Sequence, residues 1–160
     1  MQAKYRRLRE EAYARGAAEY DELVLEPTFR DFVALYIAEG YKRDRNQVSI
    51  ANSDPAVIAL AAAWLRRLSG KRLQCWVQYH ADQDLTEIQR FWGELLGVDP
   101  DGIKLQRKSN SSRLAYRQWR CVNGVITVRV SDTALRARLQ AWIDRIRVEW
   151  QVDLAAIPGA

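Results

Sequence analysis

The chain has 160 residues, of which 48% are hydrophobic, and a formal net charge of +5 at neutral pH. This size and composition exclude a disordered chain and are typical of one domain with a substantial core. The longest apolar run, residues 56–65, is about half the length that spans a bilayer, so we expect no membrane partner. Two isolated cysteines and one histidine are too few for a zinc site. We also expect no small-molecule cofactor.

The first 26 residues differ from the rest of the chain. Residues 2–22 mix positive and negative charges with few apolar residues, which predicts an exposed helix. We interpret residues 1–26 as an N-terminal helical arm or linker.

Residues 28–39 are predicted to form a helix that is apolar on nearly every side. Thr28, followed three residues later by Asp31, resembles a capping box. Gly40 is expected to end the helix in the left-handed conformation. A helix without a polar face must be covered on both flanks. It also ends with Glu39, where a cation would be favoured, and such local conflicts are typical of functional sites.

Strands and helices alternate over the rest of the chain. Val48 and Ile50 alternate with polar or small residues, which predicts a half-buried strand at 47–51. Further elements are expected in this order: a helix opened by 52–55 and ending at 69, a strand at 72–80, a helix from 84 to 97, strands at 103–108, 115–122 and 125–130, and a helix from 131 or 132. This pattern predicts one α+β domain over 27–150, with a mixed or antiparallel sheet backed by helices, and an irregular tail over 151–160.

The predicted strand at 72–80 has one polar face. Arg72, Gln74, Trp76, Gln78 and His80 alternate with apolar residues. Arginine, glutamine and serine side chains read base edges in the major groove of DNA, which admits a two-stranded ribbon. The alternative is an ordinary solvated strand. An exposed tryptophan there is otherwise a liability, although the N-terminal arm could cover it.

Positive charge is concentrated between residues 102 and 131, which contain seven basic residues and no acidic one. Such clustering is the usual footprint of a polyanion partner, and the alternative is the solvated surface of a basic protein. The seven residues are Lys104, Arg107, Lys108, Arg113, Arg117, Arg120 and Arg129.

The segment 32–40 reads Phe-Val-Ala-Leu-Tyr-Ile-Ala-Glu-Gly and resembles a degenerate LAGLIDADG motif, the signature of a family of DNA endonucleases and their non-cleaving relatives. Its small third and seventh positions match Ala34 and Ala38, and its second acidic position matches Glu39. The first leucine and the first acidic residue of the motif are replaced by phenylalanine and isoleucine. The segments 36–42 and 51–55 are similar to bacterial members, including the LAGLIDADG domain of sporulation regulators.

The resemblance implies a homodimer in which the motif helices pack together through Ala34, Leu35 and Ala38, below a saddle of antiparallel strands that lies on DNA. It further implies that two Glu39 carboxylates, one from each copy, hold Mg²⁺ over the scissile phosphates. We therefore expect binding of double-stranded DNA at a pseudo-palindromic site, with metal-dependent endonuclease activity. A non-catalytic transcription regulator and an RNA-binding or splicing factor are the alternatives.

The alternative for Glu39 is a surface ion pair with Lys42 or Arg43. The residues expected to contact DNA are Lys42, Arg43, Arg45, Gln47, Ser49, Arg72, Gln74, Trp76, Gln78, Lys104, Arg107, Lys108, Arg113, Arg117 and Arg129. The isolated cysteines and the absence of a recognisable secretory signal suggest a cytoplasmic protein. Arginine outnumbers lysine by 20 to 5, which suggests a GC-rich genome, and we expect a bacterial or phage protein. Because DNA is the expected partner, we also expect association with the nucleoid.

Overall fold

The computed structural model describes residues 1–108 and 121–159. Its contacts divide the chain into two compact units, Met1–Val48 with Ser131–Ala160, and Ser49–Val130. The first unit therefore joins the two ends of the chain. The strand expected at 115–122 falls almost entirely outside the described residues. Among the described helices, none combines the length and the apolar character that crossing a membrane requires.

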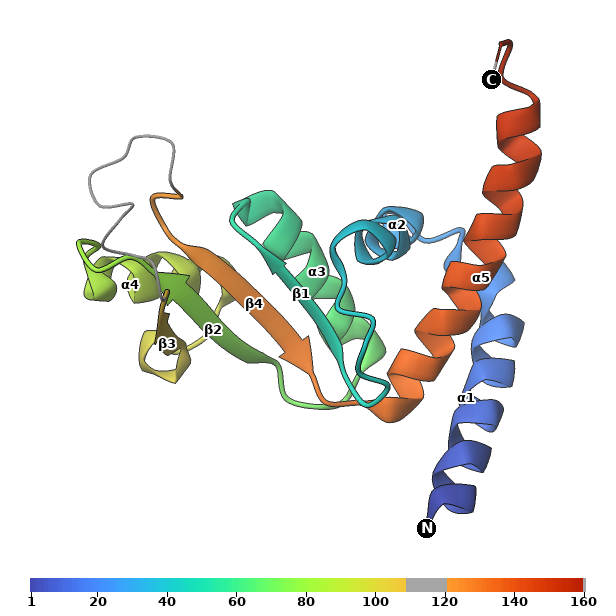
Figure 1. Ribbon diagram of the computed structural model, residues 1–160, viewed down its shortest axis with the longest axis horizontal. Helices are drawn as coiled ribbons and strands as arrows, with labels where there is room; N and C mark the ends of the chain where they lie inside the picture. The colour runs from blue at the N-terminus through green and yellow to red at the C-terminus, as the bar shows by residue number, and fades with distance from the viewer. Residues whose placement is uncertain (109–120, 160) are drawn as a thin grey trace. The chain divides into compact units, whose positions relative to one another are not determined.

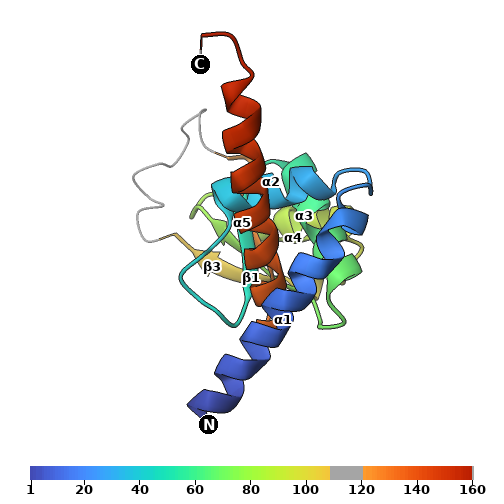
Figure 2. The same ribbon diagram turned by 90° about the vertical axis from the view of Figure 1, so that its right-hand side faces the viewer.

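The first unit is helical and contains α1 (Gln2–Leu23), α2 (Phe29–Glu39) and α5 (Thr133–Ala155). Figures 1 and 2 show α1 and α5 running side by side. The buried residues of α1 are Ala12, Gly16 and Tyr20, and their spacing of four places them on one face. The N-terminal segment is therefore a helix, as predicted, and its second half packs against α5.

The contact between α1 and α5 is close enough to require a glycine. A Cβ atom on Gly16 would lie 2.7 Å from both the Cα and the carbonyl oxygen of Arg138. The carbonyl oxygen of Gly16 also accepts a hydrogen bond of 2.9 Å from the Nε1 of Trp142. Glycine normally weakens a helix interior by roughly 1 kcal/mol relative to alanine, and here it permits the two backbones to approach.

Two local predictions for α2 are wrong, although its bounds are confirmed. Thr28 makes no side-chain capping hydrogen bond and has a φ of 66°, a conformation that is strained for a β-branched residue. Gly40 has φ −71° and ψ 145°, so it is extended rather than left-handed. A side chain at Gly40 would collide with the ring of Tyr36. The glycine is needed because the aromatic ring lies against its backbone.

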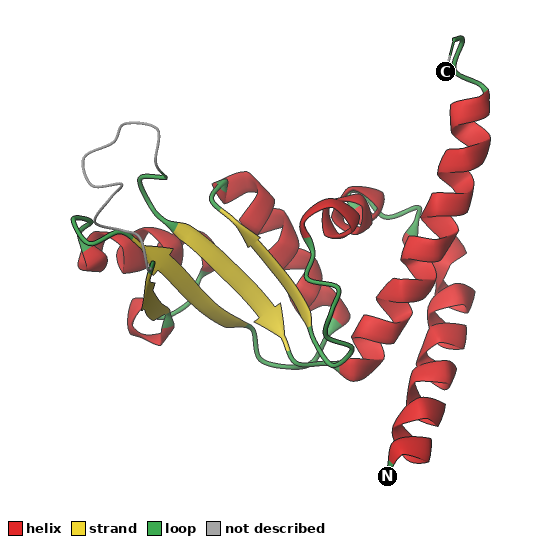
Figure 3. Ribbon diagram, in the orientation of Figure 1, coloured by secondary structure: helices red, strands yellow, loops and turns green. Residues whose placement is uncertain are grey.

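The second unit is an α+β structure, in agreement with the predicted class. Its elements are β1 (Val48–Asn52, whose first residue belongs to the other unit), α3 (Pro55–Leu68), β2 (Gln74–Tyr79), α4 (Leu85–Leu96), the 3₁₀ helix η1 (Pro100–Gly102), β3 (Lys104–Arg107) and β4 (Val125–Val130). The described strands form a mixed sheet in the order β1-β4-β2-β3 (Figure 3). β2 is antiparallel to β4 and parallel to β3. Helix α3 packs against β4 and against α4.

Aspartate side chains cap α3, α4 and α5, at the helix starts that the sequence predicted. Asp54 accepts a hydrogen bond from the amide of Ala56, and Asp84 accepts one from Glu87. Asp132 caps α5 through the amide of a residue in its first turn. Helix α5 runs to Ala155, so the irregular tail begins five residues later than expected. The residues that follow Trp150 have adequate helix propensity, and no proline or glycine occurs between Trp150 and Pro158 to end the helix earlier.

Candidate nucleic-acid interface

The outer face of the sheet is polar where the inner face is apolar. In β2, Cys75 and Val77 are buried, so the residues that alternate with them face the other way. This outer side of β2 carries Gln74, Trp76 and Gln78. The alternation predicted for this strand is therefore confirmed.

The neighbouring strands extend the outer face. Gln74 pairs with Arg129 and Trp76 with Thr127 across the antiparallel β2–β4 ladder. On the other side, Lys104 of β3 pairs with Trp76 in the parallel ladder. Residues paired in a ladder share a face of the sheet. The described outer face of β2, β3 and β4 is therefore made of basic, amide, hydroxyl and apolar side chains, and none of them is acidic.

Arg129 and Trp76 form the centre of this face. The Nε atom of Arg129 donates a hydrogen bond of 2.9 Å to the amide oxygen of Gln74. The guanidinium carbon of Arg129 lies 4.6 Å from the centroid of the Trp76 ring, within the range of a cation–π contact. The stack holds both side chains in place, and Trp76 is only half-buried.

A groove of about 410 Å³ adjoins this stack. Besides Arg129, its basic lining residues are Arg66, Arg72 and Lys104, against one acid, Asp99. The carboxylate of Asp99 accepts a hydrogen bond from the amide of Asp101 at 3.0 Å, which orients it into the 3₁₀ turn. An excess of cations beside an aromatic ring suits a phosphate backbone and its bases.

Cys75 also lines this groove, and its environment argues against a nucleophilic role. Burial raises the pKa of the Cys75 thiol, and the charge of Arg66 opposes the shift without reversing it. The sulfur therefore stays protonated at neutral pH, whereas a reactive cysteine requires a thiolate.

Other predicted residues of this unit lie elsewhere. Arg107 pairs with Tyr79 and so faces the opposite side from Lys104, and Lys108 follows the strand at its exposed end. His80 is only 6% exposed because β2 ends at Tyr79, so its predicted place on the outer face is wrong.

Ser49, at the edge strand, is also 6% exposed. The amide of Lys108 donates to the carbonyl of Tyr79 at 3.0 Å, which continues the β2–β3 pairing by one residue. Arg113 and Arg117 lie outside the described residues, as does Arg120.

The remaining predicted residues belong to the first unit. Lys42, Arg43 and Arg45 are exposed in the loop between α2 and β1, and Gln47 is half-buried at the end of this loop. They are therefore grouped with the helical unit and not with the sheet face.

Helix α2 is fully buried along one flank and partly exposed along the other. Phe29, Phe32, Val33 and Tyr36 are fully buried, and the ring of Phe29 meets that of Trp142 edge-on at 5.2 Å. The other flank contains the residues predicted for a dimer interface: Ala34 and Leu35 are half-buried, and Ala38 is exposed.

Glu39 is exposed at the end of α2. It forms no ion pair among the described residues, and Lys42 donates instead to the carbonyl of Gly40 at 3.1 Å. The described part of the chain also contains no group of three histidine, cysteine, aspartate or glutamate residues that could hold a metal. The described residues of one chain therefore do not form a metal centre around Glu39 by themselves.

The sequence did not reveal the place of two residues, Arg66 and Arg136. Arg66 lines the groove because the end of α3 packs near α4, where its guanidinium donates to the carbonyl of Leu96 at 2.6 Å. No local pattern signals this placement. Arg136 is buried within the apolar stripe of α5, and an arginine inside such a stripe could have been recognised as unusual.

The chain matches no protein-family model, and neither the curated proteins nor the solved structures gave a significant match. The fold and the described face define an α+β protein whose described strands form a mixed sheet of four, with a basic, aromatic outer surface. The similarity of residues 32–40 to the LAGLIDADG motif stays an expectation from the sequence.

Proposed function

We propose that the protein binds double-stranded DNA through the outer face of its sheet. The observation that carries this proposal is the stack of Arg129 on Trp76, set in a groove with three further basic side chains and one acid. The amides of Gln74 and Gln78 lie on the same face, and amides can pair with base edges. Lysine and arginine at the rim supply phosphate contacts, which provide most of the affinity.

The salt dependence of binding to a pool of short random-sequence duplexes tests this proposal. Replacing both Arg72 and Lys104 by glutamine removes two exposed cations from the groove. The slope of log K against log salt should become shallower by about 2. Arg90→Gln is the matched control for charge, because Glu87 and Glu94 already balance Arg90 on the surface of α4. Equal slopes for all three proteins would refute the sheet face as the binding surface.

The choice of nucleic acid is tested by competition. A mixed-sequence duplex should displace a labelled duplex more effectively than structured RNA of equal length, because the face is a sheet that fits the DNA major groove. Stronger competition by RNA would favour the RNA-binding alternative. It would also argue against contacts in a major groove, because the major groove of RNA is too deep and narrow for side chains to read.

We further propose that two copies associate through the open flank of α2. Ala38 is exposed and Ala34 half-buried, and small residues four apart let two helices approach closely. Ala38→Lys places a charge on this flank without entering the core, so it should convert a dimer into a folded monomer. Light scattering measures the change in mass. A wild-type monomer at micromolar concentration, with and without DNA, would remove both the dimer and any catalysis that depends on it.

Metal-dependent cleavage of DNA is the second candidate function. It is favoured by Glu39, a carboxylate exposed at the end of the proposed dimer helix without an ion-pair partner among the described residues. A metal there would need a carboxylate from each copy, so cleavage rests on the dimer. Glu39→Gln should abolish Mg²⁺-dependent nicking of supercoiled DNA and leave duplex affinity equal or higher. DNA binding without nicking by the wild type would identify a non-catalytic regulator.

A further inference from the structure

A second basic groove lies within the helical unit, between α1, the loop that follows α2, and the start of α5. Its volume is about 660 Å³, which is within the range of small-ligand sites. Four of its lining residues are basic and one is acidic: Arg9, Lys42, Arg45 and Arg136 against Glu10. None of these four cations forms an ion pair with a carboxylate among the described residues. The acid of the groove, Glu10, pairs instead with Arg6, whose Nε lies 3.9 Å from Oε1 of Glu10.

Arg136 is the most unusual member of this groove. It is 8% exposed, and its Nε atom is buried without a hydrogen-bond partner among the described residues. Its other contacts are uncharged: the side-chain oxygen of Gln140 at 3.1 Å, the carbonyl of Lys42 at 3.5 Å, and the ring of Tyr36 at 5.8 Å. No carboxylate pairs with this guanidinium in the part of the chain that the structure describes, and a buried charge is costly unless it is paired.

Arg138, in the same helix, is a buried arginine whose charge is neutralised by a carboxylate. It is also 8% exposed, but its Nε and terminal nitrogen donate to one carboxylate oxygen of Glu19 at 2.9 and 2.8 Å. The difference between the two arginines is therefore not burial but the presence of an acid.

Neither Asp132 nor Asp144 forms an ion pair with Arg136 in the described part of the chain, and the carboxylate of Asp132 accepts a hydrogen bond from the amide of Leu135 as the N-cap of α5. Asp144 is engaged by the amide of Gln140 at 2.9 Å and by the hydroxyl of Tyr13 at 2.9 Å. Gln140 thus stands between Arg136 and Asp144. The first turn of α5 also adds the partial positive charge of a helix N-terminus, which the Asp132 cap partly offsets.

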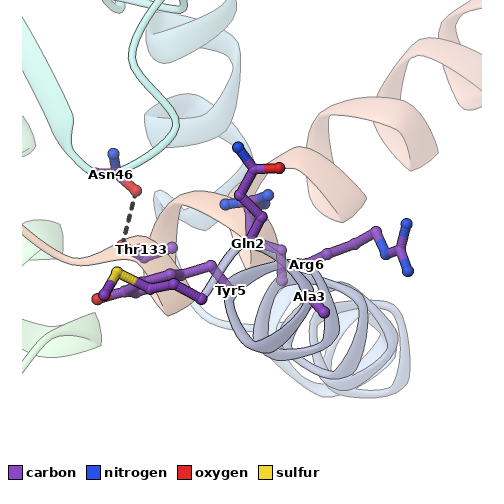
Figure 4. Close-up of a pocket in the computed structure, with 8 residues that line it drawn as sticks. Gln2, Ala3, Tyr5, Arg6, Asn46 and Thr133 are labelled. Carbon is purple, nitrogen blue, oxygen red and sulfur yellow. Dashed lines mark hydrogen bonds between the residues drawn. The ribbon is translucent and has the colours of Figure 1, made fainter.

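The loop that supplies Lys42 and Arg45 is fixed to its surroundings. The hydroxyl of Thr133 donates to the side-chain oxygen of Asn46 at 3.1 Å, and Figure 4 shows this contact beside the first turns of α1. The hydroxyl of Tyr36 donates to the carbonyl of Tyr41 at 2.6 Å. These bonds hold the loop at both ends, so its cations are placed at the groove before any ligand arrives.

We infer that this groove binds a phosphoryl group, with Arg136 as its principal ligand and Lys42, Arg45 and Arg9 around it. A phosphate carries up to two charges and several acceptor oxygens, which suits a fork of guanidinium donors better than a single carboxylate does. The group could belong to a free phosphorylated small molecule or to the backbone of a nucleic acid. The inference does not depend on DNA binding by the sheet, because it uses no residue of the sheet.

Calorimetric titration of the full chain with pyrophosphate and with inorganic phosphate, at ionic strength held constant with sodium chloride, tests the site. The wild type should bind pyrophosphate saturably at one site per chain. Arg136→Gln should weaken binding by about 10–100-fold, the loss expected for a charged hydrogen bond. Arg147→Gln removes the same charge from an exposed position on α5 and should bind like the wild type.

Stability measurements separate a ligand-binding role from a structural one. Because Arg136 lacks a counterion, Arg136→Gln should not lower the melting temperature in phosphate-free buffer. The double variant with Lys42→Gln and Arg45→Gln changes only exposed side chains and should weaken pyrophosphate binding by about 10-fold. No saturable binding by the wild type, or equal binding by Arg136→Gln, would overturn the inference.

Duplex DNA distinguishes the two sources of the phosphoryl group. If pyrophosphate displaces a duplex and Arg136→Gln weakens duplex binding, the group belongs to the nucleic acid. If duplex binding is unchanged while pyrophosphate binding is lost, the ligand is a small phosphorylated molecule. The variant with Arg72→Gln and Lys104→Gln should keep its pyrophosphate binding, so failure of the sheet proposal leaves this one standing.

Discussion

The interface between α1 and α5 and the outer face of the sheet both contain arginine and tryptophan, but they use them differently. Between the helices, Arg138 is paired with Glu19, and Trp142 is fully buried with its nitrogen bonded to a backbone carbonyl. On the sheet, Arg129 bonds an amide and stacks on a half-buried Trp76. The first arrangement joins two helices, and the second leaves a polar aromatic surface facing outward.

The difference gives a way to separate structural from ligand-binding charge. An arginine that meets a carboxylate inside the fold contributes to folding, and its removal takes a buried partner from that acid. Cations that gather around a groove with few acids create a potential that attracts anions. The comparison predicts that equivalent substitutions in the two regions will affect different measured properties.

The largest expected contrast is between the two tryptophans. Trp142→Ala removes a fully buried ring, its hydrogen bond to Gly16 and its contact with Phe29. It should lower the free energy of unfolding by about 3–5 kcal/mol. Trp76→Ala removes a half-buried ring and should cost less than half as much, while weakening binding to a duplex. Chemical denaturation and anisotropy titration of both variants measure the two effects. A Trp76 variant that lost stability but retained full DNA affinity would contradict the assignment.

A smaller contrast is expected for the arginines. Arg138→Met leaves Glu19 without its buried partner and should reduce stability by about 1–3 kcal/mol. Arg129→Met removes a hydrogen bond to an exposed glutamine and should change stability by roughly 0.5 kcal/mol. Its duplex affinity should fall, with a shallower salt dependence. The comparison fails if both variants lose the same stability and neither changes DNA binding.

The sequence predicted the features that depend on neighbouring residues. The helix starts at 52–55, at 84 and at 131 or 132, and the alternation in β2, follow from local backbone chemistry and are confirmed. Between Ser131 and Asp132 the sequence left the cap of α5 open, and the structure shows that it is Asp132. The pairing of α1 with α5 joins residues more than 100 positions apart. No local pattern encodes such a contact. Most charged residues of α1 are exposed, as predicted, and the sequence did not reveal the buried stripe of Ala12, Gly16 and Tyr20 that packs against α5.

The same limit applies to the candidate sites. Gly40 was correctly placed at the end of α2, but its role depends on the ring of Tyr36 lying over it, which is a packing effect. Gln74, Trp76 and Lys104 were found because alternation and charge signal a polar face. The groove around Arg136 was missed because its residues come from three distant segments, and an arginine in an apolar stripe looks the same whether an acid or a ligand balances it.

The smallest expected effect is a pH dependence at the helix interface. Burial of Glu19 favours its neutral form, but hydrogen bonds and charge from Arg15 and Arg138 outweigh this and hold the pKa of Glu19 below its usual value. Because the pKa is lower in the folded than in the unfolded chain, the ionised carboxylate stabilises the fold at pH values above about 4.5. That contribution is lost as the pH falls through the folded-state pKa.

Glu19→Gln isolates this contribution. The variant should be less stable than the wild type at pH 7, and the difference should shrink as the pH is lowered below about 4.5. Glu11→Gln is the matched control, because Glu11 pairs with Arg7 on the exposed side of α1, where an ion pair contributes little. Denaturant unfolding curves across this pH range provide the comparison. A difference for Glu19→Gln that stayed constant with pH would mean that the hydrogen-bond geometry, and not the charge, joins α1 to α5.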